Sequence, residues 1–218
     1  MKKQTFLIPL GLLTAFGLWT AAVMHLDVQP IGPGGSAVGL AALNGTVHRL
    51  IGVNLRLYTL TDWLGLVPIL FALGFALLGL TQWIRRRDLR KVDRDLLLLG
   101  GFYIVTMGAY LFFEHWVVNC RPVLIDGILE ASYPSSTTLL TLCVMPTAME
   151  QLRRRIRHPG IRNGVLLTLA LFTCFMVVGR LLSGVHWLSD IIGGGLLSAG
   201  LVTLYHTTLD SIGGNRDA

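Results

Sequence analysis

The sequence is poor in charged residues and in cysteine. Aspartate, glutamate, lysine and arginine make up 14% of the 218 residues, whereas 53% are hydrophobic. Soluble globular domains carry about a quarter charged residues, so this composition excludes an ordinary soluble fold and is typical of an integral membrane protein. The three cysteines lack metal-ligand spacing, and their odd number leaves at least one unpaired. Neither a disulfide framework nor a zinc site is indicated.

The basic residues do not form a nucleic-acid-binding face. The formal net charge is +6, but most lysines and arginines fall in short runs between apolar segments, such as 85–94 and 153–162. A nucleic-acid-binding domain gathers its positive charge along one solvated face. We therefore expect no nucleic-acid partner, and we expect the basic runs to contact anionic membrane lipids.

Long apolar runs predict an all-α integral membrane bundle of about six transmembrane helices, because a helix needs about 20 apolar residues to cross a bilayer. The predicted spans cover residues 6–24, 64–82, 96–118, 135–149, 165–182 and 188–205. Residues 27–57 are rich in glycine and predict a loop followed by a helix at the membrane interface. No linker separates two domains, so residues 1–218 are predicted to form a single membrane domain.

The distribution of lysine and arginine predicts the orientation, because cytoplasmic loops carry the excess of these residues. Alternate segments are strongly basic: Lys2 and Lys3, 85–94, 153–162 and Arg216. The other segments contain only Arg49, Arg56, Arg121 and Arg180. We therefore expect a multi-pass protein of the cell membrane with cytoplasmic termini. The segments around Arg121, 133–137 and 180–190 are then expected to meet at the outer face.

Residues 180–190 place three ionisable side chains, Arg180, His186 and Asp190, between the last two predicted spans. Lipid cannot solvate such groups, so their presence is a hypothesis of a functional site. His186 and Asp190 are four residues apart, which on a helix places them about 6 Å apart along one face. The carboxylate is then expected to orient the ring for attack by its other nitrogen. The alternative is a pair that only ties two helix ends together.

Phosphate is the ligand that best suits the convergence of these segments. Arg121 and Arg180 offer guanidinium groups that match phosphate oxygens, and neither has a carboxylate partner nearby in the sequence, so both are expected to be unpaired and to bind an anion. The hydroxyls of Ser135, Ser136 and Thr137 open the fourth predicted span, where free backbone amides also bind anions. The alternative is an ordinary serine or threonine cap of that helix.

The order of these motifs resembles the type 2 phosphatidic acid phosphatase superfamily, whose members are membrane lipid phosphate phosphatases related in their helical core to vanadium haloperoxidases. The family pattern is K-x6-R-P, P-S-G-H and S-R-x5-H-x3-D. This chain carries Arg121-Pro122, Pro134-Ser135-Ser136 and Arg180-x5-His186-x3-Asp190. The motif region extends over residues 114–190, and the third motif is the specific one.

The resemblance implies a role for each matching residue. His186 is the nucleophile that forms a phosphohistidine, Asp190 orients it, and water then hydrolyses the intermediate. Arg180 belongs both to the catalytic set and to the phosphate-binding set, which is Arg121, Ser135, Ser136, Thr137 and Arg180. No metal or other cofactor is expected, because arginines and amides stabilise the charge that develops during phosphoryl transfer.

Three positions depart from the family pattern, and one of them is Gly179, which stands where the family has serine. Glu114 stands where the family has its lysine, and Thr137 stands where the family has the histidine that protonates the leaving group. A positioned acid contributes about 10² to 10⁴ in rate, so this loss is the more serious one. Glu114 and His115 are the candidates for a substitute acid. They point about 100° apart on a helix, so at most one is expected to face the pocket.

The function predicted from the sequence is a membrane lipid phosphate or diphosphate phosphatase whose active site faces outside. Two other functions stay open. One is a catalytically silent relative that binds, senses or helps move a lipid phosphate, and the other is a structural membrane protein without a ligand. The substrate is left open among prenyl diphosphate, phosphatidate, phosphatidylglycerol phosphate and a phosphorylated glycolipid. Nothing in the sequence indicates an oligomeric state.

Overall fold

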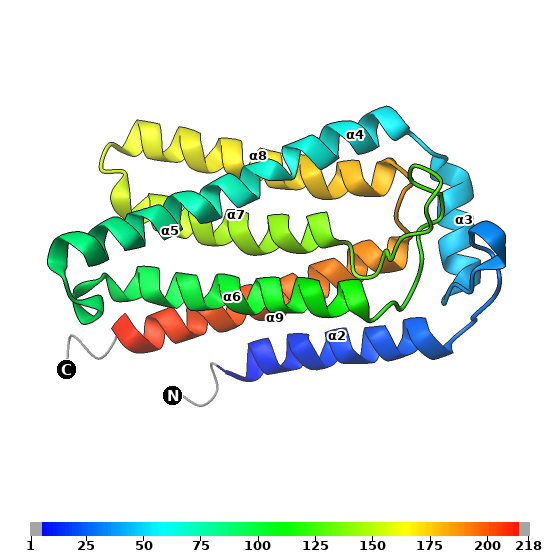
Figure 1. Cartoon of the computed structure of the whole chain (residues 1–218), viewed down its shortest axis with the longest axis horizontal. Helices are drawn as coiled ribbons and strands as arrows, with labels where there is room; N and C mark the ends of the chain where they lie inside the picture. Colours follow the sequence, from blue (N-terminus) through cyan, green and yellow to red (C-terminus); the bar gives the residue numbers. More distant parts are fainter. Residues whose placement is uncertain (1–5, 214–218) are drawn as a thin grey trace.

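The computed structural model describes residues 6–213, which form a helical bundle (Figure 1). Lys2, Lys3 and Arg216 lie outside the described residues. The α-helices are α2 (Leu7–His25), α3 (Ala41–Ile51), α4 (Leu55–Leu64), α5 (Leu66–Arg86), α6 (Arg94–His115), α7 (Ser136–Arg155), α8 (Pro159–Leu182) and α9 (Leu188–Gly213). Two 3-10 helices, η1 (Pro33–Gly35) and η2 (Leu89–Lys91), lie in connecting segments. The all-α prediction is confirmed, since residues 6–213 contain no β-strand and only isolated β-bridges.

Five helical segments are long and apolar enough to cross a membrane: Leu7–His25, Leu55–Arg86, Arg94–His115, Pro159–Leu182 and Leu188–Ile212. The protein is therefore a multi-pass membrane protein. The second segment joins α4 and α5 through Gly65 into 32 residues. It begins well before the predicted span 64–82.

Helix α7 covers the fourth predicted span but is too polar to count among these five. It lies in the middle of the bundle and contacts α5, α6, α8 and α9 (Figure 1). Because protein and not lipid covers this helix, polar side chains are tolerated where they are hydrogen-bonded. Thr147 donates to the carbonyl of Cys143, and Gln151 Nε2 donates to the hydroxyl of Tyr205 on α9 at 3.0 Å.

The segment before α7 is anchored in the core by Tyr133. Its hydroxyl lies 2.7 Å from Thr20 Oγ1 on α2, and its ring packs against Gly193 on α9. A Cβ atom at Gly193 would lie 2.6 Å from Tyr133 Cε2, so only glycine permits this approach. The ring stacks on Phe16 and thereby fixes the loop that leads into α7.

The two ends of the bundle differ in character (Figure 1). One end carries the start of α2, the end of α9, and the α5–α6 and α7–α8 connections, which contain the basic runs. The opposite end carries α3, the loop 116–135 and the α8–α9 turn. The candidate residues therefore gather at the end away from the basic runs. Which end faces the cytoplasm stays a prediction from the charge distribution.

Candidate active site

The turn between α8 and α9 brings Arg180 and His186 together. Arg180 lies in the last turn of α8, and the chain reverses at Gly184, which has a φ of +68°. A Cβ atom at Gly184 would lie 1.9 Å from the carbonyl oxygen of Gly52, so the turn requires glycine for both its conformation and its packing. Nε2 of His48 on α3 lies 3.0 Å from the Gly184 carbonyl oxygen, and its N–H donates a hydrogen bond to that oxygen.

The imidazole of His186 is held by the Arg180 guanidinium. The ring is buried, and its Nε2 lies 3.3 Å from Nη2 of Arg180. A guanidinium only donates hydrogen bonds, so Nε2 is the acceptor and the neutral ring carries its proton on Nδ1. Burial, followed by the positive charges of Arg180 and Arg121, lowers the pKa of His186 well below its usual value. The ring is therefore neutral, with its lone pair on Nε2.

Asp190 faces the protonated side of the ring from the first turn of α9. The expectation that His186 and Asp190 share one helix face is wrong, because α9 begins at Leu188 and His186 precedes it. Asp190 Oδ2 accepts from the backbone N–H of Trp187 at 2.9 Å and lies 3.6 Å from Nδ1 of His186. That separation is too long for a hydrogen bond but places a carboxylate beside the ring. Asp190 thus caps the helix and lies next to the imidazole.

A buried network fixes Asp190. Ser189 Oγ donates to Asp190 Oδ1 at 3.4 Å, and Asn44 on α3 binds both Oγ of Ser189 (2.9 Å) and its backbone N–H (3.0 Å). Asn44 also donates to the carbonyl of Gly39, whose N–H donates to Asn119. Asn44 is fully buried. Sequence reasoning missed this residue, because nothing in the pattern of residues 27–57 relates it to a segment 145 residues away.

The N-terminus of α7 forms another wall of the site. The backbone N–H of Ser135 donates to the Asp190 carbonyl at 3.1 Å, which ties α7 to α9. Ser135 is buried and its Oγ accepts from Thr138 at 3.0 Å, so this hydroxyl is already engaged. Of the three predicted hydroxyl residues, Ser136 lines the cavity. Thr137 instead faces Gly65, where a Cβ atom would lie 3.6 Å from its Cγ2. The first amides of any α-helix lack partners within the helix.

Each of the two arginines has a carboxylate neighbour, so the expectation of unpaired arginines is wrong. Nε of Arg121 lies 2.9 Å from Oε2 of Glu130, and Nη1 of Arg180 lies 3.4 Å from Oδ1 of Asp62. The pairing is incomplete, because Nη1 of Arg121 and Nε of Arg180 are buried without a hydrogen-bond partner among residues 6–213. Buried donors of this kind are costly unless a ligand accepts from them.

Tyr58 on α4 places its ring beside both guanidinium groups. The Cζ atoms of Arg180 and Arg121 lie 5.0 Å and 5.8 Å from the ring centroid. These distances lie within the range of cation–π attraction, which holds two like charges on one side of the site. Sequence reasoning missed Tyr58, Asp62 and Glu130. The signal that marks Asp62 is the same one that marked residues 180–190, an ionisable side chain beside an apolar span.

A cavity of about 400 Å³ lies beside these residues at one end of the bundle. Its walls include His186, Arg121, Ser136 and the carboxylates of Asp62, Glu114 and Glu130. His115 is not on the wall: it is exposed, and its Nδ1 lies 2.8 Å from the Leu111 carbonyl oxygen. The structure therefore places one of the two candidate acids, Glu114, at the cavity.

Residues 71–212 match the family model of the PAP2 superfamily. The chain belongs to the PAP2 superfamily. Its fold is similar to that of a transmembrane PAP2-type phosphatidylglycerolphosphate phosphatase from Bacillus subtilis, with a TM-score of 0.66 and 19% sequence identity. The match covers 94% of this chain and 97% of that one. No curated protein matches the sequence. At this identity the likeness concerns the fold.

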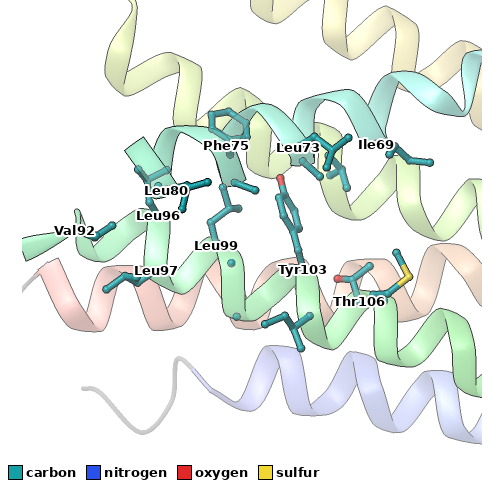
Figure 2. A pocket seen from close by; sticks show the side chains of 18 of the residues that line it. Ile69, Leu73, Phe75, Leu80, Val92, Leu96, Leu97, Leu99, Tyr103 and Thr106 are labelled. Atoms are coloured by element: carbon teal, nitrogen blue, oxygen red, sulfur yellow. The ribbon is translucent and has the colours of Figure 1, made fainter. Parts of the chain in front are cut away.

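This PAP2 protein has a second cavity that is almost wholly apolar. It measures about 640 Å³ and runs between α5 and α6, whose side chains face it in Figure 2. Tyr103 and Thr106 are polar members of its wall, and the Tyr103 hydroxyl lies 3.1 Å from Thr147 Oγ1. Met107 lines this groove, and Tyr110, one turn further along α6, lines the first cavity. One turn of α6 therefore separates the wall of this groove from the wall of the site.

Proposed function

We propose that this protein is a membrane lipid phosphate or lipid diphosphate phosphatase that acts through a phosphohistidine at His186. The observation that carries the proposal is the buried His186 ring, whose unprotonated Nε2 faces Arg180 while its opposite nitrogen faces Asp190. A neutral imidazole with an oriented lone pair is a nucleophile, and a neighbouring carboxylate stabilises the positive charge that the ring gains on attack.

Arg121, Arg180, Ser136 and the first amides of α7 provide the phosphate-binding set in this proposal. Buried guanidinium nitrogens without a hydrogen-bond partner within residues 6–213 include Nη1 of Arg121 and Nε of Arg180, which can donate to phosphate oxygens. The arginines stabilise the charge on the transferring phosphoryl group. Thr137 contributes through its backbone amide, since its side chain is turned to Gly65. Ser135 ties α7 to the site, because its N–H donates to the Asp190 carbonyl and its Oγ accepts from Thr138.

A lipid substrate fits the second cavity. The groove between α5 and α6 offers apolar walls for a lipid tail (Figure 2). Met107 on its wall lies one turn of α6 from Tyr110 on the wall of the polar cavity, where a phosphate head group would bind. The distribution of lysine and arginine supports cytoplasmic termini and an active site at the outer face of the cell membrane. A lipid of the outer leaflet would then reach the site sideways from the membrane.

Thr137, at the position where the family has its acid, leaves two possible routes for the leaving group. Glu114 lies on the cavity wall and is the substitute acid that the sequence suggests. A lipid diphosphate depends less on a general acid, because its leaving group is itself a phosphate and departs with less need of a proton. Both routes use the same nucleophile and the same arginines.

A catalytically silent binder of lipid phosphate is the second candidate. The specific observation in its favour is that carboxylates of Asp62 and Glu130 lie against the two arginines, while Thr137 carries no ionisable group at the position where relatives place their acid. Such a site holds a phosphate but releases no alcohol from it. The nucleophile, its orienting carboxylate and Arg180 are all retained, which favours the enzyme.

Phosphate release from purified protein tests the proposal. Detergent-solubilised protein is given a panel of lipid monophosphates and diphosphates beside the variants His186→Ala and His25→Ala. His25 is exposed at the end of α2 and serves as the matched control. We expect release by the wild type and by His25→Ala, and none by His186→Ala. Binding of phosphatidate without release from any substrate would favour the silent binder.

A further inference from the structure

Asp62 is the carboxylate most closely tied to the nucleophile. It lies in the last turn of α4 and lines the cavity together with His186. Its Oδ1 lies 3.4 Å from Nη1 of Arg180, and Nη2 of the same guanidinium lies 3.3 Å from Nε2 of His186. One planar group therefore bridges the attacking nitrogen and a carboxylate. The Asp62 side chain is 55% exposed, so it can move toward a bound substrate and exchange protons with water.

Thr137 cannot supply a proton to the leaving group at neutral pH, because an aliphatic hydroxyl is far too weak an acid. Its side chain also packs toward Gly65, which belongs to the turn that carries Asp62: the N–H of Gly65 donates to the Asp62 carbonyl at 3.0 Å. The short side chain at residue 137 thus lets the end of α4 lie close to the start of α7. That packing brings a carboxyl group into the site from a different helix.

The other two carboxylates on the cavity wall, Glu130 and Glu114, are less closely connected to His186 than Asp62 is. Glu130 lies beside Arg121, whose backbone N–H also binds the Glu130 carbonyl, so this residue belongs to the loop 116–135. Glu114 is exposed on α6 and makes no ion pair or side-chain hydrogen bond among residues 6–213. Of the three, Asp62 shares its guanidinium partner with His186.

We propose that Asp62 is the general acid and base of the site, an inference that rests on the proposed phosphatase function. In the first step, Nε2 of His186 attacks phosphorus, the bond from phosphorus to the ester oxygen breaks, and the departing oxygen takes the proton of the Asp62 carboxyl group. The products are the alcohol, a phosphohistidine and an Asp62 carboxylate. Asp190 lies beside the ring that has gained positive charge.

In the second step, the Asp62 carboxylate takes a proton from water as the water oxygen attacks phosphorus. The nitrogen–phosphorus bond breaks, its electron pair returns to Nε2, and inorganic phosphate leaves. Asp62 is again protonated and the cycle closes without any other reactant. A phosphate bound at Arg180 competes with Asp62 for the guanidinium, which frees the Asp62 side chain to turn toward the leaving group.

Substrates whose leaving groups differ in their need of a proton test the role of Asp62 as acid. We compare release of phosphate from a lipid monophosphate with an alkyl leaving group, and from p-nitrophenyl phosphate, whose leaving group departs without a proton. Asp62→Asn keeps the shape and a hydrogen-bonding oxygen near Arg180. We expect it to lower kcat for the alkyl ester by about 10²- to 10⁴-fold, and kcat for the aryl ester by less than about tenfold. Asp126→Asn, in an exposed turn outside the cavity, is the matched control.

A second variant sharpens the test. Asp62→Glu keeps a carboxyl group on a side chain that is longer by one methylene, and we expect it to retain part of the activity on the alkyl ester that Asp62→Asn loses. Equal losses on both esters in Asp62→Asn would overturn the proposal, because they would indicate a role in holding Arg180. The proposal would also be overturned if Asp62→Asn kept full activity on the alkyl ester while Glu114→Gln lost it, because the acid would then be Glu114.

Failure of the proposed function has a different signature. A wild type that releases no phosphate from either ester overturns both the phosphatase and the role of Asp62. A wild type whose release depends on His186 but whose Asp62→Asn variant shows no leaving-group dependence overturns the role of Asp62 alone. Hydrolysis of the aryl ester by Asp62→Asn also reports that the variant is folded with its nucleophile in place.

Discussion

Nη2 of Arg180 lies 3.3 Å from Nε2 of His186, on the side of the ring away from Asp190. The contact fixes which ring nitrogen carries the lone pair, because a guanidinium donates and never accepts. It also places a positive charge where the phosphoryl group would arrive. The same guanidinium reaches Asp62 through Nη1, so one side chain contacts both the residue that we propose as nucleophile and the residue that we propose as acid.

Arg180→Lys tests this bridging role. Lysine keeps the positive charge but has no planar group that spans two partners, so it cannot contact His186 and Asp62 together. We expect kcat/KM for lipid phosphate to fall by about 10²- to 10³-fold, as for loss of one transition-state donor. Arg49→Lys, exposed on α3 and bonded to Thr46, is the control. Unchanged kcat/KM in Arg180→Lys would contradict the bridging role.

The acid limb of the pH profile is expected to depend on Arg121. Burial and the charges of Arg180 and Arg121 lower the pKa of His186, and only the neutral ring attacks. Activity is therefore present above the pKa of His186 and lost as the pH falls through it, which places this limb below about pH 6.5. Arg121→Gln removes one repelling charge, so the pKa rises and the limb moves to higher pH.

Profiles of kcat/KM against pH for wild type and Arg121→Gln, with the same substrate, check this expectation. Ionisation of the substrate contributes equally to both profiles, so the difference between them belongs to the enzyme. A limb that stays in place, or that moves to lower pH, would show that the group titrating there is not an imidazole facing Arg121.

Asn44→Ala tests whether α3 positions the catalytic turn. The change removes the buried hydrogen bonds from Asn44 to Ser189 and Gly39. Each buried group left without a partner costs about 1–3 kcal/mol. We expect a lower unfolding temperature. We also expect kcat to fall by a larger factor than the factor by which KM changes, because Asp190 is held through Ser189. Asn163→Ala, exposed at the start of α8, should alter neither quantity.

Gly184→Ala tests the turn between α8 and α9. The residue has a positive φ, and an added Cβ would lie 1.9 Å from a backbone oxygen of Gly52. A side chain in the left-handed conformation costs about 1–2 kcal/mol before any clash is counted. We expect a lower unfolding temperature and loss of phosphate release. Gly195→Ala on α9 is the control, because a Cβ there meets nothing within 4 Å; equal behaviour of the two variants would contradict the account of the turn.

The helices and the order of the site motifs could be predicted from sequence because both are local signals. Apolar runs located the spans, and the spacing of Arg180, His186 and Asp190 was readable in one stretch of the chain. The start of α9 at Leu188 agrees with the start of the predicted span 188–205, but the expectation of a shared helix face ignored that His186 precedes this start, where the carboxylate of Asp190 acts as the cap. The pair therefore meets across a helix start and not along a helix face.

The remaining members of the site depend on packing between distant segments. Asp62 and Arg180 are 118 residues apart, and Asn44 and Ser189 are 145 residues apart. No periodicity in one sequence relates such positions. The polarity of α7 is also a property of its place in the bundle, because its neighbours remove it from lipid. Its span was predicted too short for the same reason, since polar residues continue the helix to Arg155.

Detection of the covalent intermediate tests the central claim most directly. Wild-type protein is mixed with a lipid phosphate, quenched within milliseconds in alkali, digested and examined by mass spectrometry. We predict phosphate on the peptide that contains His186, stable in alkali, lost in acid, and absent from His186→Ala. Phosphate on another residue, or turnover of substrate with no phosphorylated peptide at any quench time, would contradict the account.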